Sequence, residues 1–513
     1  MKYFVGVVCL LCVGWVQAQT QASVPYTPSW QVRHHLQWLA DHADLPLTLS
    51  QWPLPKAAIE RALADMPYKA DHHTEHVAWI REQVLRDLQL YGQRGQFRGQ
   101  LRTPAESLSG FDDNYTPGSS LQIQSSEWQW GQASDAATVA VRLGMRLEAS
   151  SHSLQNDFKG HGSRGHVQFR PEGSAMALGF GGWQLQAFSH QHWWGPGWQS
   201  SLVNGHNNPS WTGLGVQRLS VSPSRSAWLS WMGPWNLDVF VARAQDPLVV
   251  SQQPSGFLFS GMRLTLKPQT WLELGVSRGL QTGGAGRPGG VVNFMKAFAG
   301  QELNKNPEDS FEDSSSQIAG YDARLRCPKS WGALLGSCAA YTQWMGEDAA
   351  GQLPLPFKFM SLWGWESTYG DGQYRVFAEW TNTNAYSLPW DSQPTFPGYL
   401  NSVYRQGYTQ GGRWVGSAQG AGSRVITLGW MDASAQRLFK VHKGRIHVSL
   451  GSYDPGVNAP RGDLWGFSAS QAMTWGGMRL TPELAYLHLS EGDDQRANHR
   501  KSLRFGLSID MPL

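Results

Sequence analysis

The stretch VAVRLGMRLEA (139–149) indicates the class of fold, because apolar and polar residues alternate along it. A period of two is typical of a β-strand with one apolar face and one polar face. The apolar face carries Val139, Val141, Leu143, Met145 and Leu147, and the opposite face carries Arg142, Gly144, Arg146 and Glu148. The stretch is therefore predicted to be a strand whose two faces meet different environments.

The same alternation recurs along most of the chain. It is present in GMRLTLK (261–267), WLELGVS (271–277) and SLRFGLSIDM (502–511). From about residue 96 onward the sequence contains roughly twenty such segments, separated by turns rich in Gly, Pro, Ser, Asn and Asp. An all-β fold follows, and a soluble sandwich or propeller fits the alternation as well as a membrane barrel does.

Three features favour a closed antiparallel transmembrane β-barrel over residues 96–513. The polar faces carry charges of both signs, which suits a wet lumen, and aromatic residues recur at predicted strand ends, as in WMGPW (231–235) and WGWESTY (363–369). The strand region also runs for about 400 residues without a linker or a repeat of propeller length. One departure is the end of the chain, Met511-Pro512-Leu513, where barrels often have an aromatic residue.

The first residues, MKYFVGVVCLLCVGWVQA (1–18), have a charged start, an apolar middle and a small-residue exit. This pattern predicts a secretory signal peptide cleaved after Ala18, and an uncleaved anchor is the alternative. Apolar positions then recur at helical spacing over 27–92, with Thr27-Pro28 as the predicted start of the first helix. We therefore expect a small helical bundle over 19–95.

Two cysteines remain after the predicted cleavage, Cys327 and Cys338. An even pair in an exported chain predicts a disulfide, with two free thiols as the alternative. The formal net charge of +3 gives no reason to expect a nucleic-acid partner.

The stretch HQHWWGPGWQSSLVNGHNNPSW (190–211) is unusually rich in Trp, His and Asn. Indole faces next to neutral hydrogen-bonding groups suit sugars, whereas an aromatic plug or brace inside the barrel is the structural alternative. The candidate glycan-binding residues here are Trp193, Trp194, Trp198, Asn207, Asn208 and Trp211. Arg413 is a further candidate because a guanidinium binds acidic sugars through paired hydrogen bonds, and a lumenal ion pair is its alternative.

Other chemistry finds little support in the sequence. Two histidine groups allow a metal pair but not a full ligand set, so no metal is predicted; they are His72, His73 and His76, and His190, His192 and His206. No nucleophile elbow, zinc-protease motif or phosphate loop is present, although paired carboxylates for glycan cleavage cannot be recognised by spacing. We predict no enzymatic activity and no cofactor.

The segment HQHWWGPGWQSSLVNGHNNPSWTGLGVQR (190–218) resembles the signature segment of the Wzi capsule-assembly family. The matching features are the turn Trp193-Trp194-Gly195-Pro196-Gly197, the step Ser201-Leu202 and the turn Asn207-Asn208-Pro209-Ser210. Further similar segments are LPLTLSQWPLPKAAIERAL (45–63), FSGMRLTLKPQTWLELGVSRGLQTGGAGRP (259–288), FAEWTNT (377–383) and YRQGYTQGGRWVGSAQGAGS (404–423). The last one departs from the family pattern at Gly422-Ser423, where an acidic residue would be expected before the serine.

The resemblance implies a barrel of about eighteen strands in the bacterial outer membrane, with a periplasmic helical bundle at one mouth. It implies a lectin-like protein that helps attach or organise capsular polysaccharide, or a related exopolysaccharide, at the cell surface. The expected partners are that polysaccharide, outer-membrane lipid and the polysaccharide export machinery, and the expected state is a monomer. A porin-like diffusion channel is the alternative function, and the Trp-rich stretch and the helical bundle disfavour it because both would obstruct a pore.

Overall fold

The computed structural model describes residues 21–67, 74–113, 115–116, 118–132, 135–150, 154–155, 162–163, 166–224, 226–245, 254–299, 315–332, 336–349, 356–387, 391, 394–433, 441–453, 462–491 and 498–513. The predicted signal peptide and two residues of the first histidine group, His72 and His73, lie outside these ranges. Within them, no helix combines the length and the apolar character needed to cross a membrane.

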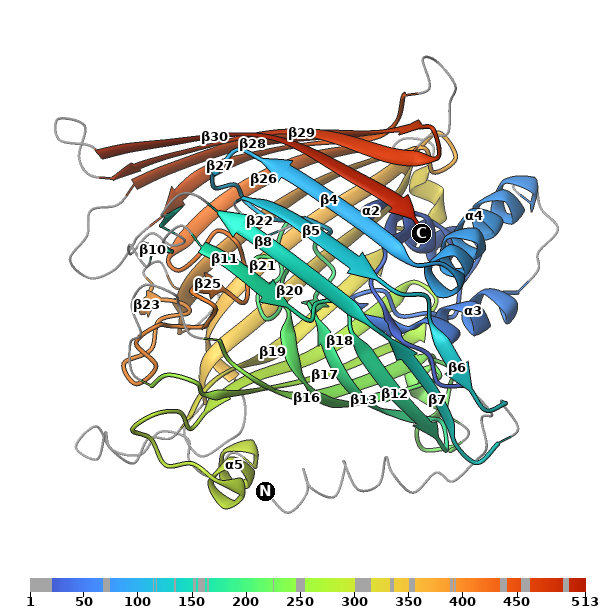
Figure 1. Ribbon diagram of the computed structural model, residues 1–513, viewed down its shortest axis with the longest axis horizontal. Helices are drawn as coiled ribbons and strands as arrows, with labels where there is room; N and C mark the ends of the chain where they lie inside the picture. Colours follow the sequence, from blue (N-terminus) through green and yellow to red (C-terminus); the bar gives the residue numbers. More distant parts are fainter. Residues whose placement is uncertain are drawn as a thin grey trace.

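Most of the described strands form one closed antiparallel barrel, and the others form small two-stranded sheets (Figure 1). Its strands in chain order are β4 Gln96–Arg102, β5 Ser119–Gln124, β6 Trp128–Trp130, β7 Thr138–Arg142, β8 Gly144–Ser150, β11 His166–Arg170, β12 Ala175–Phe180, β13 Trp183–His190, β15 Trp211–Arg218, β16 Trp235–Arg243, β17 Leu258–Gln269, β18 Leu272–Thr282, β19 Ser315–Arg326, β20 Ser337–Ala349, β21 Pro356–Tyr369, β22 Tyr374–Tyr386, β23 Phe396–Pro397, β26 Ser423–Asp432, β27 Val441–Tyr453, β28 Gly462–Trp475, β29 Met478–Glu491 and β30 Asn498–Pro512. Pairing of β30 with β4 closes the ring. The predicted all-β fold is confirmed.

Three segments of the barrel wall are each divided into two consecutive strands by a short break in the strand. β5 and β6 pair with β8 and β7, and these in turn pair with β11 and β12. β23 has only two residues, which pair with the end of β22.

The barrel has apolar side chains outside and charged side chains inside. On β7 and β8 and in the break between them, Leu143, Met145 and Leu147 are between 44% and 57% exposed. Arg142 and Arg146, which alternate with them, are at most 3% exposed. This is the reverse of a soluble sandwich or propeller, whose apolar faces pack against each other, so the soluble alternatives are wrong.

Among the described residues, three helices precede the barrel, with the bounds α2 Trp30–His42, α3 Lys56–Ala64 and α4 Thr74–Gln93. α2 begins later than the sequence predicted, because the Ser29 hydroxyl caps it by accepting from the Val32 N–H. Thr27 and Pro28 therefore lie outside the helix. His76 on α4 packs its ring edge-on against Trp38, which is an aromatic contact.

Helix α2 packs against α4 and also against the inside of the barrel. Every residue from Trp30 to Asp41 is buried, and its apolar residues share one core cluster with lumen-facing residues of the barrel. Figure 1 shows α3 and α4 outside one end of the barrel, next to the C-terminus. We call this the helix-bearing end and the opposite one the loop end.

The two ends differ in the length of their connections. At the helix-bearing end, β12 joins β13 through Gly181 and Gly182, and β28 joins β29 through Gly476 and Gly477. All four glycines have positive φ, as tight hairpin turns require. At the loop end the connections are long, among them 103–118, 191–210, 283–314 and 387–422; the third contains α5, Val291–Phe298.

A disulfide joins Cys327 to Cys338 in the connection between β19 and β20, with the two Cα atoms 5.3 Å apart. The backbone N–H of Cys327 also donates to the Cys338 carbonyl, at 2.8 Å. The cross-link therefore reinforces a turn that is already hydrogen-bonded, at the helix-bearing end.

Replacing both cysteines with alanine should leave the barrel folded and lower its stability only modestly. The cross-linked residues are 11 apart in sequence, and closing so short a loop contributes at most about 3 kcal/mol in the chain-entropy model. The measurement is the temperature at which the compact band of the unheated protein converts to the unfolded band on a gel. A double variant with no compact band at all would contradict this local role.

Candidate functional site

The connection between β13 and β15, residues 191–210, folds back into the lumen; we call it the inward loop. Its first residues form β14, Trp193–Trp194, which pairs with β2, Gln51–Trp52, from the N-terminal segment. The Gly195 N–H also donates to the Ser50 carbonyl, at 2.8 Å. A small sheet inside the barrel thus joins a segment from the helix-bearing end to a loop from the loop end.

The four tryptophans of the predicted sugar platform are buried. Trp193, Trp194, Trp198 and Trp211 are each at most 1% exposed. Trp211 stacks on Phe259 with ring centroids 4.3 Å apart, and the other three also pack against protein groups. With their faces covered by protein, they form the plug or brace that was the structural alternative.

A cation fixes the middle of this plug. The guanidinium of Arg33, on α2, lies 4.3 Å from the ring centroid of Phe111 and 4.2 Å from that of Trp198. It also donates to the Pro196 carbonyl, at 2.9 Å. Burial lowers the pKa of Arg33 to about 10, so the group remains charged at neutral pH. Such a sandwiched cation is attracted to both ring faces, most strongly where water is excluded.

Residues 196–200 form a tight turn, which we call the Trp198 turn, and the Glu379 carboxylate on β22 binds it. Glu379 accepts hydrogen bonds from the backbone N–H groups of Trp198, Gln199 and Ser200. It also accepts one from the Tyr341 hydroxyl, at 2.9 Å. A buried carboxylate is tolerated only when donors surround it in this way.

A second carboxylate, Glu366 on β21, links the turn to a chain of ion pairs. It accepts from the indole N–H of Trp198, at 2.6 Å, and pairs with Arg324 and Arg375 on the lumen wall. Arg324 in turn binds Asp41 of α2 through two hydrogen bonds of 2.8 and 2.7 Å. The same network therefore holds both the inward loop and the N-terminal helix.

The remaining glycan candidates are also engaged within the protein. Arg413 donates to the Asn207 carbonyl at 2.7 Å and to its side-chain oxygen at 3.1 Å. It pairs with Glu106 as well, at 3.3 Å, which is the lumenal ion pair considered as its alternative. The Asn208 carbonyl accepts from the Gln191 side chain. These residues brace neighbouring loops against each other.

The histidines of the inward loop pack as aromatic rings. His192 stacks on Phe240 with centroids 4.3 Å apart, and the Nδ1 atom of His206 accepts from the Asp112 N–H at 3.0 Å. Burial lowers the pKa of His206 to about 3, so it is neutral near pH 7. Among the described residues, no three His, Cys, Asp or Glu side chains are arranged to hold a metal ion.

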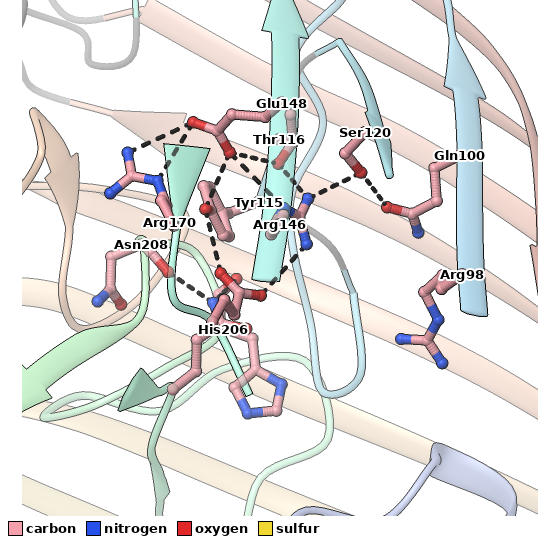
Figure 2. A network of polar contacts seen from close by, with 12 residues as sticks. Arg98, Gln100, Tyr115, Thr116, Ser120, Arg146, Glu148, Arg170, His206 and Asn208 are labelled. Atoms are coloured by element: carbon pink, nitrogen blue, oxygen red, sulfur yellow. Dashed lines mark hydrogen bonds and ion pairs between the residues drawn. The ribbon is translucent and has the colours of Figure 1, made fainter. Parts of the chain in front are cut away.

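Beside the plug, the lumen keeps a polar cavity of about 560 Å³. Figure 2 shows the hydrogen-bonded wall next to it: Arg146 reaches Ser120 at 3.1 Å, and Ser120 reaches Gln100 at 3.0 Å. Arg146 also pairs with Glu172, at 3.2 Å. This cavity lies between the plug and the barrel strands. Within the described part of the chain, it is the candidate site for a bound ligand.

Sequence reasoning did not identify three residues on which the plug depends: Arg33, Glu366 and Glu379. The two glutamates had a recoverable signal, because strand alternation places each on the lumen face. Arg33 gave no such signal. Helix α2 is buried on all sides, so the positions of its polar residues in the sequence do not distinguish Arg33 from a residue that would face solvent on an ordinary surface helix.

Comparison with known proteins agrees with this architecture. The family model described as capsule assembly protein Wzi matches residues 101–435. The chain belongs to the Wzi capsule assembly family. The predicted family resemblance is therefore confirmed, and the matched range contains the inward loop and most of the lumen wall.

Two similar proteins can be compared with this Wzi-family chain in more detail. A Klebsiella pneumoniae protein described as an uncharacterized 55.8 kDa protein in the cps region is 29% identical over 366 residues, which is 69% of this chain and 64% of that protein. The alignment thus spans less than two thirds of the relative. The structure of Escherichia coli Wzi, described as a carbohydrate-binding β-barrel of the outer membrane involved in group 1 capsule assembly, aligns with a TM-score of 0.73 at 22% identity. It covers 96% of this chain and 99% of that one, and shows that the fold is shared.

Replacing Glu379 with alanine should release the Trp198 turn and open the lumen. The change leaves three backbone donors and the Tyr341 hydroxyl without their acceptor, and each unsatisfied buried group costs about 1–3 kcal/mol. We expect steady conductance in planar bilayers and a lower temperature of unfolding on gels.

The matched control for this substitution is Glu379→Gln, which keeps one acceptor oxygen and nearly the same shape. It should conduct less and resist heat better than the alanine variant. An alanine variant as closed and as heat-resistant as the parent would show that the carboxylate does not hold the turn.

Proposed function

We propose that this protein is an outer-membrane β-barrel that binds capsular polysaccharide, or a related exopolysaccharide, and holds it at the cell surface. The match to the Wzi capsule assembly family over residues 101–435 carries the proposal. The likeness in fold to Escherichia coli Wzi, a carbohydrate-binding β-barrel, supports it.

Two observations support placement in a membrane. Apolar side chains cover the outside of the strands, as the alternation predicted. Exposed tryptophans gather in the connections at the helix-bearing end, namely Trp228, Trp231, Trp271 and Trp331, and Trp475 ends β28 there. Aromatic girdles of this kind mark the edge of the lipid-facing band in outer-membrane barrels. If β5–β6, β7–β8 and β11–β12 each count as one crossing and β23 is set aside, the proposed barrel has eighteen crossing strands.

The lengths of the connections suggest the orientation. Outer-membrane barrels have short periplasmic turns and longer extracellular loops. The helix-bearing end would then face the periplasm, with residues 19–95 as the N-terminal segment and 96–513 as the barrel. The polymer would meet the loop end. We take the barrel to act as a monomer, since one chain completes the closed sheet without strands from a second copy.

The plug favours attachment over a diffusion channel. The inward loop, α2 and the network around Glu366 fill the lumen with buried side chains, which leaves an open pore little room. In this proposal the predicted glycan residues act indirectly: Trp193, Trp198 and Arg413 hold the loops in the arrangement that the polymer meets.

Deleting the gene in the source bacterium tests attachment. We expect most of the polysaccharide to move from the cell-bound fraction to the medium, with the total amount unchanged, and the parent gene to reverse the shift. The purified protein should also give no large steady open state in planar bilayers. An unchanged cell-bound fraction would refute attachment, and a large open state in the parent protein would favour the channel.

Placing arginine on the lipid-facing surface tests the membrane assignment. Leu428, in the middle of β26, is 55% exposed, and Leu428→Arg should destabilise the barrel in lipid by about 2–4 kcal/mol. Trp475→Arg, at the rim, is the control and should cost about 1 kcal/mol or less. Equal costs at the two positions in unfolding titrations from lipid vesicles would argue against a buried band.

A further inference from the structure

The polar cavity of about 560 Å³ reaches solvent at the helix-bearing end. Thr474, Gly477 and Pro512 line it there and are themselves exposed. Its inner end reaches Asp113 and His206 beneath the inward loop. Its volume lies in the roughly 300–1,000 Å³ range of small-molecule sites, so a ligand could enter from this end.

Carboxylates slightly outnumber arginines in the lining. Five arginines and six carboxylates line the cavity; four of the arginines are in ion pairs, and the fifth, Arg479, has none among the described residues. The pairs are Arg98–Asp510, Arg102–Glu483, Arg146–Glu172 and Arg445–Asp113. With no excess of positive charge, the lining does not select an anion, and so many charged groups disfavour an apolar ligand.

Four polar atoms of the lining have neither a hydrogen bond nor an ion pair among the described residues: His190 Nε2, His206 Nε2, Ser210 Oγ and Arg479 Nε. Two of these residues are deeply buried, His206 at 4% and Ser210 at 2% exposed. Because His206 Nδ1 accepts from the Asp112 N–H, its proton resides on Nε2, which is therefore a donor. A buried donor that lacks an acceptor is costly, so a ligand hydroxyl here would be stabilising.

We propose that this cavity binds a short neutral saccharide that enters from the helix-bearing end. Each sugar hydroxyl both donates and accepts, which matches a lining where guanidinium donors stand next to carboxylate acceptors. Tyr26, Trp30 and Phe97 line the same space and add aromatic faces for the apolar side of a sugar ring. The site would lie at the end of the barrel opposite the loops that are proposed to hold the capsule, and so goes beyond the attachment function.

The test is saturation-transfer NMR on the full purified chain in detergent micelles. The neutral probes are maltose, lactose and cellobiose, and sodium glucuronate is the charged comparison. We expect transfer from the protein to at least one neutral disaccharide and at least threefold weaker transfer to glucuronate. Absence of transfer to all three disaccharides, or a preference for glucuronate, would overturn the proposal.

Variants on β29 locate the binding. Thr481 lines the cavity, whereas strand alternation points Leu484 outward. Thr481→Trp should fill the space and abolish transfer, and Leu484→Trp, with an indole on the same strand, should behave as the parent. Undiminished transfer in a folded Thr481→Trp protein would place the sugar elsewhere and overturn the site.

A milder variant covers the case in which Thr481→Trp does not fold. Gln122 on β5 also lines the cavity, and Gln122→Met keeps its length while removing its polar atoms. It should weaken binding at least threefold, and unchanged binding would overturn the proposal. Capsule retention after gene deletion is a separate readout, so failure of this site and failure of the attachment function are distinguishable.

Discussion

The charged side chains of the lumen wall need hydrogen-bonding partners inside the barrel. The rest of the structure depends on the partners that Glu379 finds there. Its carboxylate is buried, and three backbone N–H groups of the Trp198 turn satisfy it. Burying an ionised carboxylate without donors would be prohibitive. The wall therefore requires the inward loop as much as the loop requires the wall, and the barrel and its plug form one unit.

Two segments from opposite ends of the barrel meet at this unit. The N-terminal helix contributes Arg33 and Asp41, and the inward loop contributes Trp198, with Glu366 and Arg324 of the wall between them. Each segment supplies hydrogen-bonding or charged partners for polar groups of the other. Neither segment alone would therefore satisfy all of its buried polar groups. This explains why the N-terminal helices share a core with the barrel.

Alternation along single strands was enough to predict the all-β fold and which side chains face inward, as Arg146 and Leu147 illustrate. The use of the Trp-rich stretch could not be predicted, because an indole beside asparagine suits a sugar and a packed plug equally well. The deciding contacts, Arg33 with Trp198 and Trp198 with Glu366, join residues far apart in the chain. Such contacts leave no local pattern, so only the three-dimensional arrangement distinguishes the two uses.

A filled lumen changes what a barrel of this kind can do. An open barrel exchanges solutes between its two ends, whereas a plug built from both ends connects them mechanically. The backbone pairing of β14 with β2, together with the Arg33 contact to Pro196, forms a continuous path from the loop end to the helix-bearing end. A load applied to the loop end would therefore be shared by the barrel wall and the N-terminal segment. Such load sharing suits the proposed attachment role better than a role in solute transport.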